Sequence, residues 1–265
     1  MYSKLAELCS WAYAIVWSFS FYPIIYLLIS IKSSDSISFD YILLNILGYL
    51  CYTTSIYLQL FNQTVINQFK LRFHGNLPLL SIADVAYSVH GLMLNLLLCS
   101  QILYGNKIWG FKNKRVTFRS SRLTNITYGA FLIFCLYHWL NAENKHQFLE
   151  FALQLSYFKM WISFVKYLPQ VMHNRKRKSM YGISKLQIFM DLSGCFFATT
   201  ELVLKNKGSL LELISSNTGK LGIILVTFTF DVVYLAQFRI YTHTDPDNII
   251  KNFNGATKEK VIAEV

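Results

Sequence analysis

Charged residues are scarce in this sequence. They make up 15% of its 265 residues, against 54% hydrophobic residues, whereas a soluble domain usually carries about 25% charge. This shortage excludes an intrinsically disordered chain and argues strongly against an ordinary soluble enzyme. The composition instead predicts an all-α membrane protein whose main surroundings are the lipid bilayer.

Motifs for nucleotide, cofactor and metal chemistry are also missing. The chain has no Walker loop, dinucleotide-binding fingerprint or nucleophile elbow, which disfavours both an ATP-driven pump and an enzyme. No cysteine–histidine cluster has the spacing of a metal site, and we expect neither a metal nor a cofactor. The cysteines form no C-x-x-C pair, and their odd number excludes a fully paired disulfide framework. They are Cys9, Cys51, Cys99, Cys135 and Cys195.

Acidic residues are fewer than basic ones, 14 against 25, which gives a net charge of +11. The basic residues sit in short clusters between long apolar runs, so no basic folded face is left to read a nucleic-acid groove. We therefore expect no nucleic-acid partner. Such clusters are typical of the cytoplasmic loops of a membrane protein.

Seven segments are long and apolar enough to cross the hydrocarbon core, which takes about 20 residues. They are Leu5–Ile31, Ser38–Phe61, Leu77–Tyr104, Leu123–Leu140, Phe148–Val171, Ile183–Leu204 and Gly219–Ile240. An odd number of spans places the two termini on opposite sides of the membrane.

The charge of the loops predicts the orientation. The loops after the first, third and fifth spans carry more lysines and arginines than the loops on the opposite side, and positive charge is retained in the cytosol. The N-terminus is therefore expected in the lumen and the C-terminus in the cytosol. The sequon Asn62-Gln63-Thr64 then lies in a lumenal loop, which predicts glycosylation of Asn62.

The chain matches itself at an offset of 146 residues. The matched pairs are Pro23 with Pro169, Lys32-Ser33 with Lys178-Ser179, Asn45 with Asp191, Gly48 with Gly194 and, with one residue of slip, Asp84 with Asp231. We expect two parallel three-helix repeats, spans 1–3 and 5–7, joined by span 4, which is a transporter architecture. Residues 1–104 form the first repeat, 105–147 the basic loop and connector, 148–241 the second repeat, and 242–265 a cytosolic tail.

The two matched prolines lie near the cytoplasmic ends of the first helix of each repeat. A proline inside a helix removes a backbone hydrogen bond and kinks the chain. Pro23 and Pro169 are therefore predicted to act as paired hinges. The alternative is that they only set the packing angles of the helices.

Four ionisable residues inside the predicted spans stand out. Each costs about 2.5–3.5 kcal/mol at mid-helix on insertion scales, so a function is expected for them. They are Asp84, Lys159, Asp191 and Asp231. Protonation of a buried carboxylate removes a desolvation penalty, which gives proton coupling a physical basis.

Two other outcomes stay open for these charges. Lys159 and one aspartate would form a structural ion pair if the lysine had no other role. Asp84 lies nearer a helix end, where water would reach it in part. Lys166 is expected to extend to the cytoplasmic surface instead of facing the interior.

These motifs resemble the PQ-loop family and, within it, the cystinosin family of lysosomal cystine transporters and their fungal relatives. The second repeat carries the sharper match, in Lys166-Tyr167-Leu168-Pro169-Gln170, Asn174, Lys178-Ser179, Gly182-Ile183-Ser184 and Asp191-Leu192-Ser193-Gly194. The first repeat contributes Phe21-Tyr22-Pro23, Ser36-Ile37-Ser38, Asn45 and Gly48. Ala83-Asp84-Val85, Ser156-Tyr157-Phe158-Lys159 and Phe230-Asp231-Val232-Val233 resemble the third, fifth and seventh helices. The likeness runs roughly from Trp17 to Tyr241.

The resemblance implies export of cystine, coupled to protons, from an acidic lysosomal, vacuolar or endosomal lumen to the cytosol. It implies three sets of residues. The proton-linked carboxylates are Asp84, Asp231 and Asp191; the substrate site holds Lys159, Asn174, Asp191, Gln187 and Asn45; and the hinges are Pro23, Pro169 and Gln170.

The sequence departs from the family at two of these positions. Ile24 replaces the glutamine of the first loop, and Gln187 stands where an asparagine is common. The tail segment beginning Asp245-Pro246 offers sorting machinery a degenerate acidic signal, although a solvated tail is the simpler interpretation.

Other functions remain open. An exporter of cationic or other amino acids would have the same fold, and a seven-helix trafficking receptor would have a similar one. Lys159 argues against a cationic substrate, and few lumenal basic residues are available for a receptor pocket. A sugar facilitator would not need three intramembrane aspartates, and a G-protein-coupled receptor would not carry the repeat.

Overall fold

The computed structural model describes residues 2–35, 37–113, 119–141, 147–180, 183–206 and 208–241, and all regular structure in these ranges is helical. The elements are α1 (Tyr2–Phe19), α2 (Phe21–Ile31), α3 (Phe39–Phe61), α4 (Gln63–Arg72), α5 (Ile82–Leu103), α6 (Gly105–Ile108), α7 (Arg122–Leu140), α8 (Gln147–Arg177), α9 (Lys185–Lys205), α10 (Leu210–Ser216) and α11 (Thr218–Ile240). The all-α prediction is confirmed. The tail at 242–265, with its possible sorting signal, lies outside the described residues.

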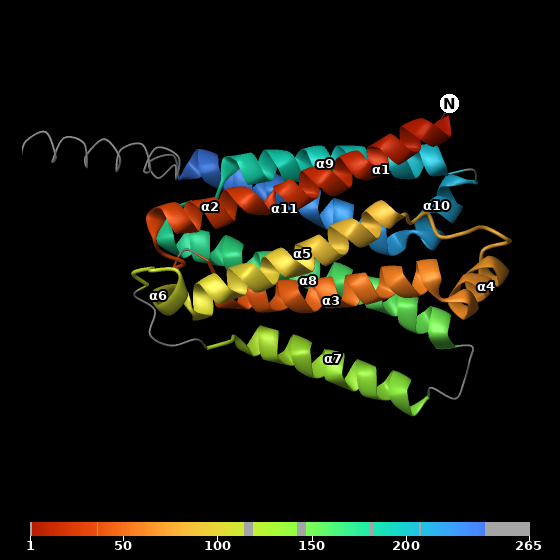
Figure 1. The fold of residues 1–265 in the computed structure, drawn as a ribbon, viewed down its shortest axis with the longest axis horizontal. Helices are drawn as coiled ribbons and strands as arrows, with labels where there is room; N and C mark the ends of the chain where they lie inside the picture. The colour runs from red at the N-terminus through yellow and green to blue at the C-terminus, as the bar shows by residue number, and fades with distance from the viewer. Residues whose placement is uncertain are drawn as a thin grey trace, which may run out of the picture.

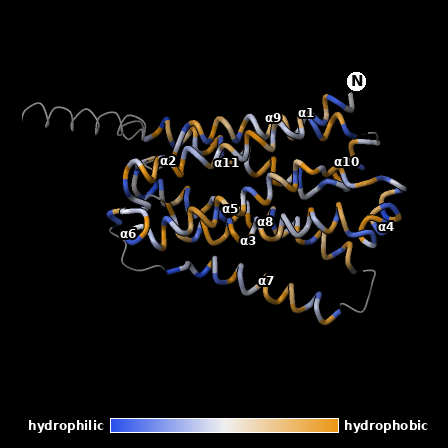
Figure 2. Tube along the Cα trace, viewed as in Figure 1, coloured by the Kyte–Doolittle hydropathy of each residue, from blue (hydrophilic) through white to orange (hydrophobic). Residues whose placement is uncertain are grey.

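The long helices lie side by side as one bundle (Figure 1). Six stretches are long and apolar enough to cross a membrane: α1 with α2, α3, α5, α7, α9 and α11. The seventh expected span is α8, whose 31 residues include several lysines and arginines. Hydrophobic residues follow the middle of the helices, and hydrophilic residues gather toward the two ends (Figure 2). This distribution suits a bundle surrounded by hydrocarbon.

Three short helices cap the ends of the bundle, where the sequence indicated only loops. These helices are α4, α6 and α10. We call the end with α4 and α10 the α4 end, and the opposite end, where α6 lies beside α2, the α2 end (Figure 1). Asn62 ends α3 and begins α4, and its side-chain oxygen accepts the Val65 backbone N–H at 3.2 Å. That N-cap explains why the chain turns directly from α3 into α4.

The helix packing repeats, with the two halves exchanging partners. α1 lies against α9 and α3 lies against α8, so the first helix of each repeat packs on the second helix of the other. Within each repeat, the third helix contacts the first two. Both α1 and α8 start at the α4 end (Figure 1), as expected for parallel repeats.

The matched glycines lie where the exchanged helices meet. A Cβ at Gly194 would overlap the Trp17 ring across the α1–α9 contact. A Cβ at Gly48 would lie 3.1 Å from atoms of Lys159 and Ile162 on α8. The repeat therefore preserves a small residue at each crossing because the helices approach closely there.

The connector α7 lies to one side of the bundle (Figure 1), and its main contacts are with α3 and α8. Phe131 and Phe134 pack on α8, and the Tyr128 hydroxyl donates to the Leu43 carbonyl at 2.9 Å. Most of its apolar side chains are exposed, including Leu132 and Ile133. Such a face suits contact with lipid.

The two prolines act differently on their helices. The first span is interrupted at Ser20, and Pro23 lies in the first turn of α2, where a missing N–H costs nothing. Pro169 lies inside the continuous helix α8. The first span is therefore broken near its proline, whereas α8 continues as one helix through Pro169. The hinge role of both residues stays a prediction.

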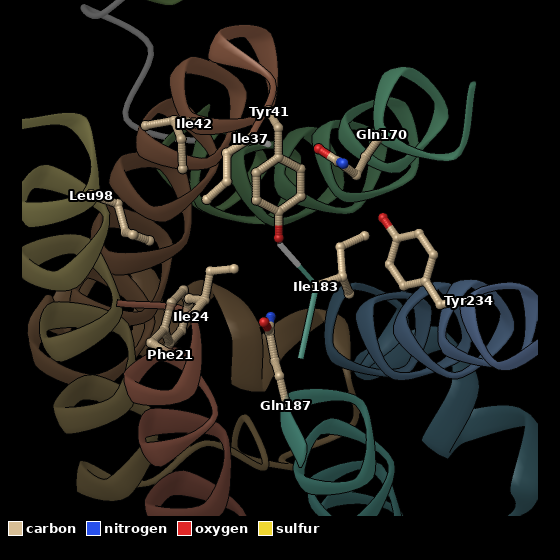
Figure 3. Close-up of a pocket in the computed structure, with 10 residues that line it drawn as sticks. All are labelled: Phe21, Ile24, Ile37, Tyr41, Ile42, Leu98, Gln170, Ile183, Gln187 and Tyr234. Atoms are coloured by element: carbon tan, nitrogen blue, oxygen red, sulfur yellow. The ribbon is translucent and has the colours of Figure 1, made fainter. Parts of the chain in front are cut away.

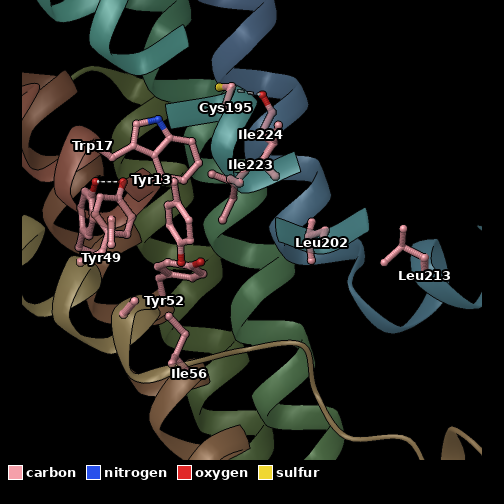
Figure 4. Packing of buried hydrophobic residues seen from close by; sticks show 14 residues of the cluster. Tyr13, Trp17, Tyr49, Tyr52, Ile56, Cys195, Leu202, Leu213, Ile223 and Ile224 are labelled. Carbon is pink, nitrogen blue, oxygen red and sulfur yellow. Dashed lines mark hydrogen bonds between the residues drawn. The ribbon is translucent and has the colours of Figure 1, made fainter. Parts of the chain in front are cut away.

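A cluster of aromatic residues joins the two halves near the middle of the bundle (Figure 4). Trp17 contacts the rings of Tyr13 and Tyr87, and the Tyr49 and Tyr87 hydroxyls are hydrogen-bonded at 2.6 Å. Isoleucine and leucine side chains of α9 and α11 complete this core. The cluster forms one wall of the cavity described next.

Candidate functional site

A polar cavity of about 40 Å³ lies in the middle of the bundle between the two repeats. Its charged and amide-bearing lining residues all come from the second repeat: Lys159, Lys166, Gln187 and Asp191. The first repeat contributes mostly aromatic rings: Trp17, Phe21, Tyr41, Tyr49, Tyr52 and Tyr87. A zwitterion would meet charges on one side and ring faces on the other.

Lys159 and Lys166, both on α8, face this central cavity. The Lys159 ammonium lies 3.9 Å from the centroid of the Tyr49 ring, which is a cation–π contact. The Lys166 ammonium donates to Asn45 Oδ1 at 2.9 Å and also lies over the ring of Tyr167. The expectation that Lys166 reaches the surface is wrong, because Asn45 and the rings hold it inside.

Asp191 and Gln187 lie one turn apart on α9 and line the same cavity. The backbone carbonyl of Asp191 accepts the Trp17 indole N–H at 2.9 Å, which ties α9 to α1. Asn45, the repeat partner of Asp191, is 1% exposed and reaches the cavity through Lys166. The repeat thus supplies two polar groups in matched positions beside the cavity.

A second cavity of about 50 Å³ lies toward the α2 end (Figure 3). Most of its lining is apolar, and Gln170, Gln187 and two tyrosine hydroxyls are its polar groups. Phe21, Tyr41 and Gln187 line both this cavity and the central one. These three side chains therefore stand between the two spaces.

Asn174 does not line the central cavity. It is fully buried in a chain of amides, accepting from Gln170 Nε2 at 3.0 Å and donating to Gln237 Oε1 at 3.0 Å. Gln237 in turn donates to the Val171 carbonyl near Pro169. The structure therefore places Asn174 in the packing of α8 against α11 at the α2 end, away from the other predicted substrate residues.

A third cavity, of about 30 Å³, lies toward the α4 end. Ser55, Gln59 and Lys220 are among its polar lining residues, and Tyr52 lines both this cavity and the central one. The three cavities follow one another along the bundle, separated by aromatic side chains.

Asp84 belongs to a buried charge cluster beside the third cavity. Its carboxylate lies 2.8 Å from the Lys220 ammonium, accepts the Tyr13 hydroxyl, and accepts the Ser81 backbone N–H at 2.7 Å. The expectation that water reaches Asp84 is wrong, since its side chain is 0% exposed. The capping box with Ser81 at the start of α5 supplies the polar partners that water would have provided.

Sequence reasoning missed three members of this charge cluster. Lys220 also pairs with Glu201 at 2.6 Å, and Glu201 pairs with Lys205 at 2.5 Å. Lys220 and Glu201 lie within the predicted spans, so a count of every charge inside a span would have found those two. Within the part of the chain that the structure describes, Lys159 forms no ion pair with an aspartate, and the lysine paired with Asp84 is Lys220.

Asp231 lies on α11 and is 2% exposed. Among the described residues it forms no ion pair, and its Oδ2 atom and the nearby Tyr234 hydroxyl have no hydrogen-bond partner. It is thus a buried carboxylate without the partners that Asp84 has. The described residues also contain no group of three or more histidines, cysteines or acids placed to hold a metal.

Comparison with known proteins supports the sequence-based assignment. The PQ loop repeat family matches residues 5–65 and 152–210, one segment in each half. A cystine transporter of Saccharomyces cerevisiae is 29% identical over 90% of this chain and 94% of its own length. A cystinosin homolog of Dictyostelium discoideum is 26% identical over 95% and 86%, and cystinosin of Bos taurus 26% identical over 89% and 62%. The chain is therefore a multi-pass membrane protein of the PQ-loop class that belongs to the cystinosin family, a family of transporters and not of enzymes.

Proposed function

We propose that this protein exports cystine from an acidic lysosomal, vacuolar or endosomal lumen to the cytosol, coupled to protons and by alternating access. The observation that carries the proposal is the central cavity between the repeats, which combines two ammonium groups, a carboxylate and tyrosine rings. The relatives named as cystine transporter and cystinosin support the choice of substrate.

The charges of the central cavity complement those of cystine, which carries two carboxylates and two ammonium groups. Lys159 and Lys166 are two turns apart on α8, a rise of about 10 Å, and both face the cavity. We assign them to the carboxylates of the substrate. Asp191 and Gln187 then receive an ammonium group, and Asn45 positions Lys166 through its hydrogen bond.

The cavity volumes support alternating access. About 40 Å³ accommodates a few water molecules and is too small for two linked amino acids. Entry therefore requires Tyr52 to move at the α4 end, and release requires Phe21 and Tyr41 to move at the α2 end. In this scheme Pro23 and Pro169 are the hinges, and Gln170 links α8 to the Ser38 N–H beside α3 at 3.4 Å.

Asp231 is the first candidate for the coupling proton. An unpaired carboxylate is costly to bury while charged, so a proton arriving from the acidic side removes a penalty that opposes reorientation. Asp191, inside the cavity, is the second candidate. Asp84, the third candidate, is paired with Lys220. No cofactor enters this scheme, because protons supply the driving force.

The α2 end is assigned to the cytosol and the α4 end to the lumen. The basic residues Lys107, Lys112 and Arg175 lie toward the α2 end, and positive charge is retained in the cytosol. Asn62 lies at the α4 end, where a lumenal enzyme would reach its side chain. In this proposal the N-terminus lies in the lumen and the C-terminus in the cytosol.

An uptake measurement tests the proposal. The protein is redirected to the plasma membrane, and entry of labelled cystine is followed from media at pH 5.5 and pH 7.4, with lysine and glucose as competitors. We expect uptake that rises with acidity and ignores both competitors. Competition by lysine would favour a cationic amino-acid exporter. No uptake by folded, surface-exposed protein would favour a trafficking receptor.

A further inference from the structure

The charge cluster beside the third cavity joins the two repeats. Asp84 comes from α5 in the first repeat, whereas Lys220 and Glu201 come from α11 and α9 in the second. The Lys220 ammonium lies 2.8 Å from Asp84 Oδ1 and 2.6 Å from Glu201 Oε2. One lysine is therefore shared between a carboxylate of its own repeat and a carboxylate of the other.

The cluster is balanced in charge and sealed on most sides. Lys220 and both carboxylates are at most 3% exposed at their side chains, while Lys205 is 22% exposed at the rim. The charged or titratable groups facing the cluster are Tyr13 from α1, Tyr52 from α3, Asp84 from α5, Glu201 and Lys205 from α9, and Lys220 from α11. Two carboxylates and two ammonium groups cancel, so a single proton unbalances the set.

Separating the repeats at this end must break the contact between Lys220 and Asp84. A buried ammonium left without a partner is strongly unfavourable, and that cost would hold the end closed. Glu201 changes this outcome, because it moves with Lys220 and keeps it paired. When Asp84 takes up a proton, the first repeat is released while the lysine stays neutralised within the second.

We propose that Glu201 is a positioning residue that holds Lys220 while Asp84 is protonated from the α4 side, so that the cluster works as an acid-released latch between the repeats. Ser55 stands at the repeat-matched position of Glu201, so the second carboxylate exists on one side only. The inference rests on the proposed function for the direction of the acidic compartment. It does not depend on which solute is carried.

The latch is tested on purified full-length protein in detergent by labelling a cysteine in the third cavity. Ser55→Cys places a thiol in that cavity, and a water-soluble maleimide reports whether the α4 end is open. Each value is corrected for native cysteines. It is then divided by the labelling of exposed Thr64→Cys at the same pH, because thiols react more slowly in acid.

Relative labelling of Ser55→Cys is expected to rise several-fold from pH 7.5 to pH 5. Adding Asp84→Asn should give high labelling already at pH 7.5. Adding Glu201→Gln should keep labelling low at pH 5, and Glu201→Asp should restore the rise. Glu150→Gln, the same change on an exposed carboxylate at this end, should leave the profile unchanged.

Two results would overturn the latch. One is that Ser55→Cys labelling depends on pH in the same way with and without Glu201→Gln. The other is that labelling of the Glu201→Gln variant is already high at pH 7.5. If Glu201→Gln does not fold, as judged by a single gel-filtration peak, the double variant Glu201→Gln/Lys205→Gln restores the charge balance. The same two results in the double variant would overturn the latch. Cystine takes no part in this measurement, so failed uptake and a failed latch are separate results.

Discussion

Asp84 and Asp231 occupy matched positions in the two repeats, yet their carboxylates lie in opposite environments. Asp84 contacts Lys220 at 2.8 Å and accepts hydrogen bonds from Tyr13 and Ser81. Asp231 has no ion pair within the described part of the chain, and its Oδ2 accepts no hydrogen bond there. The repeat therefore preserves the aspartate but not its contacts, and we expect different effects from substituting the two residues.

Asp231→Asn should abolish the acid stimulation of uptake while the protein remains folded. The amide mimics the protonated carboxyl, so the variant no longer gains from a proton at pH 5.5, and its uptake should not exceed the value at pH 7.4. Its unfolding temperature in detergent should stay the same or rise, because no buried charge loses a partner. Exposed Glu7→Gln is the control, and a normal pH profile in Asp231→Asn would remove this residue from the proton path.

Lys220→Met should lower the stability of the folded protein strongly. It leaves Asp84 and Glu201 buried without their shared ammonium, and breaking a buried pair costs about 3–5 kcal/mol. Lys205→Met removes the partly exposed lysine of the same cluster and should have a clearly smaller effect. Thermal unfolding of the two purified variants compares them directly. If both variants unfolded at the temperature of the unsubstituted protein, the cluster would not stabilise the fold.

Lys159→Met and Lys166→Met should each weaken cystine binding about 10-fold or more, because a hydrogen bond to a charged group is worth about 1.5–3 kcal/mol. Both ammonium groups face the central cavity, so neither substitution should act only on folding. Lys70→Met, on exposed α4, is the matched control. Concentration dependence of uptake measures the change, and an unaltered half-saturation value for Lys166→Met would assign that lysine to packing with Asn45.

Much of this architecture could be predicted from the sequence. The length of the apolar runs located the spans, and the match at an offset of 146 residues located the two halves. Both signals depend only on the types of residue along the chain. The fate of single charges was harder. Lys166 lies close enough to a helix end to reach water, and only the three-dimensional contact with Asn45 shows that it turns inward.

Asn174 illustrates a second limit of sequence reasoning. The family resemblance placed it in the substrate site, whereas in the structure it bonds to Gln170 and Gln237. Gln237 lies 63 residues further along the chain, and no local sequence pattern predicts a hydrogen bond between residues so far apart. The Lys220 cluster differs from this case, because Lys220 and Glu201 lie inside predicted spans and could have been counted from the sequence. Only the structure shows that they meet Asp84 from three different helices.

Glycine substitutions test the exchanged packing of the repeats. Gly194→Ala should destabilise the protein by about 1–3 kcal/mol, the usual cost of overpacking. The added methyl would overlap the Trp17 ring and displace its hydrogen bond to the Asp191 carbonyl. Gly129→Ala on α7 is the matched control, because a Cβ there has no atom within 4 Å. It should be neutral or stabilising by up to about 1 kcal/mol, and equal effects at the two sites would contradict close α1–α9 packing.

The two prolines offer the last comparison, because one lies inside a helix and the other in a first turn. Pro169→Ala restores a backbone N–H within α8, so the helix should stiffen and turnover should slow several-fold. Substrate affinity should change less, since Pro169 does not line the central cavity. Pro23→Ala should have a smaller effect, because the break at Ser20 precedes it and its N–H would have no helical partner to gain. Initial uptake rates over a range of cystine concentrations separate turnover from affinity, and a loss of affinity at normal turnover in Pro169→Ala would count against the hinge.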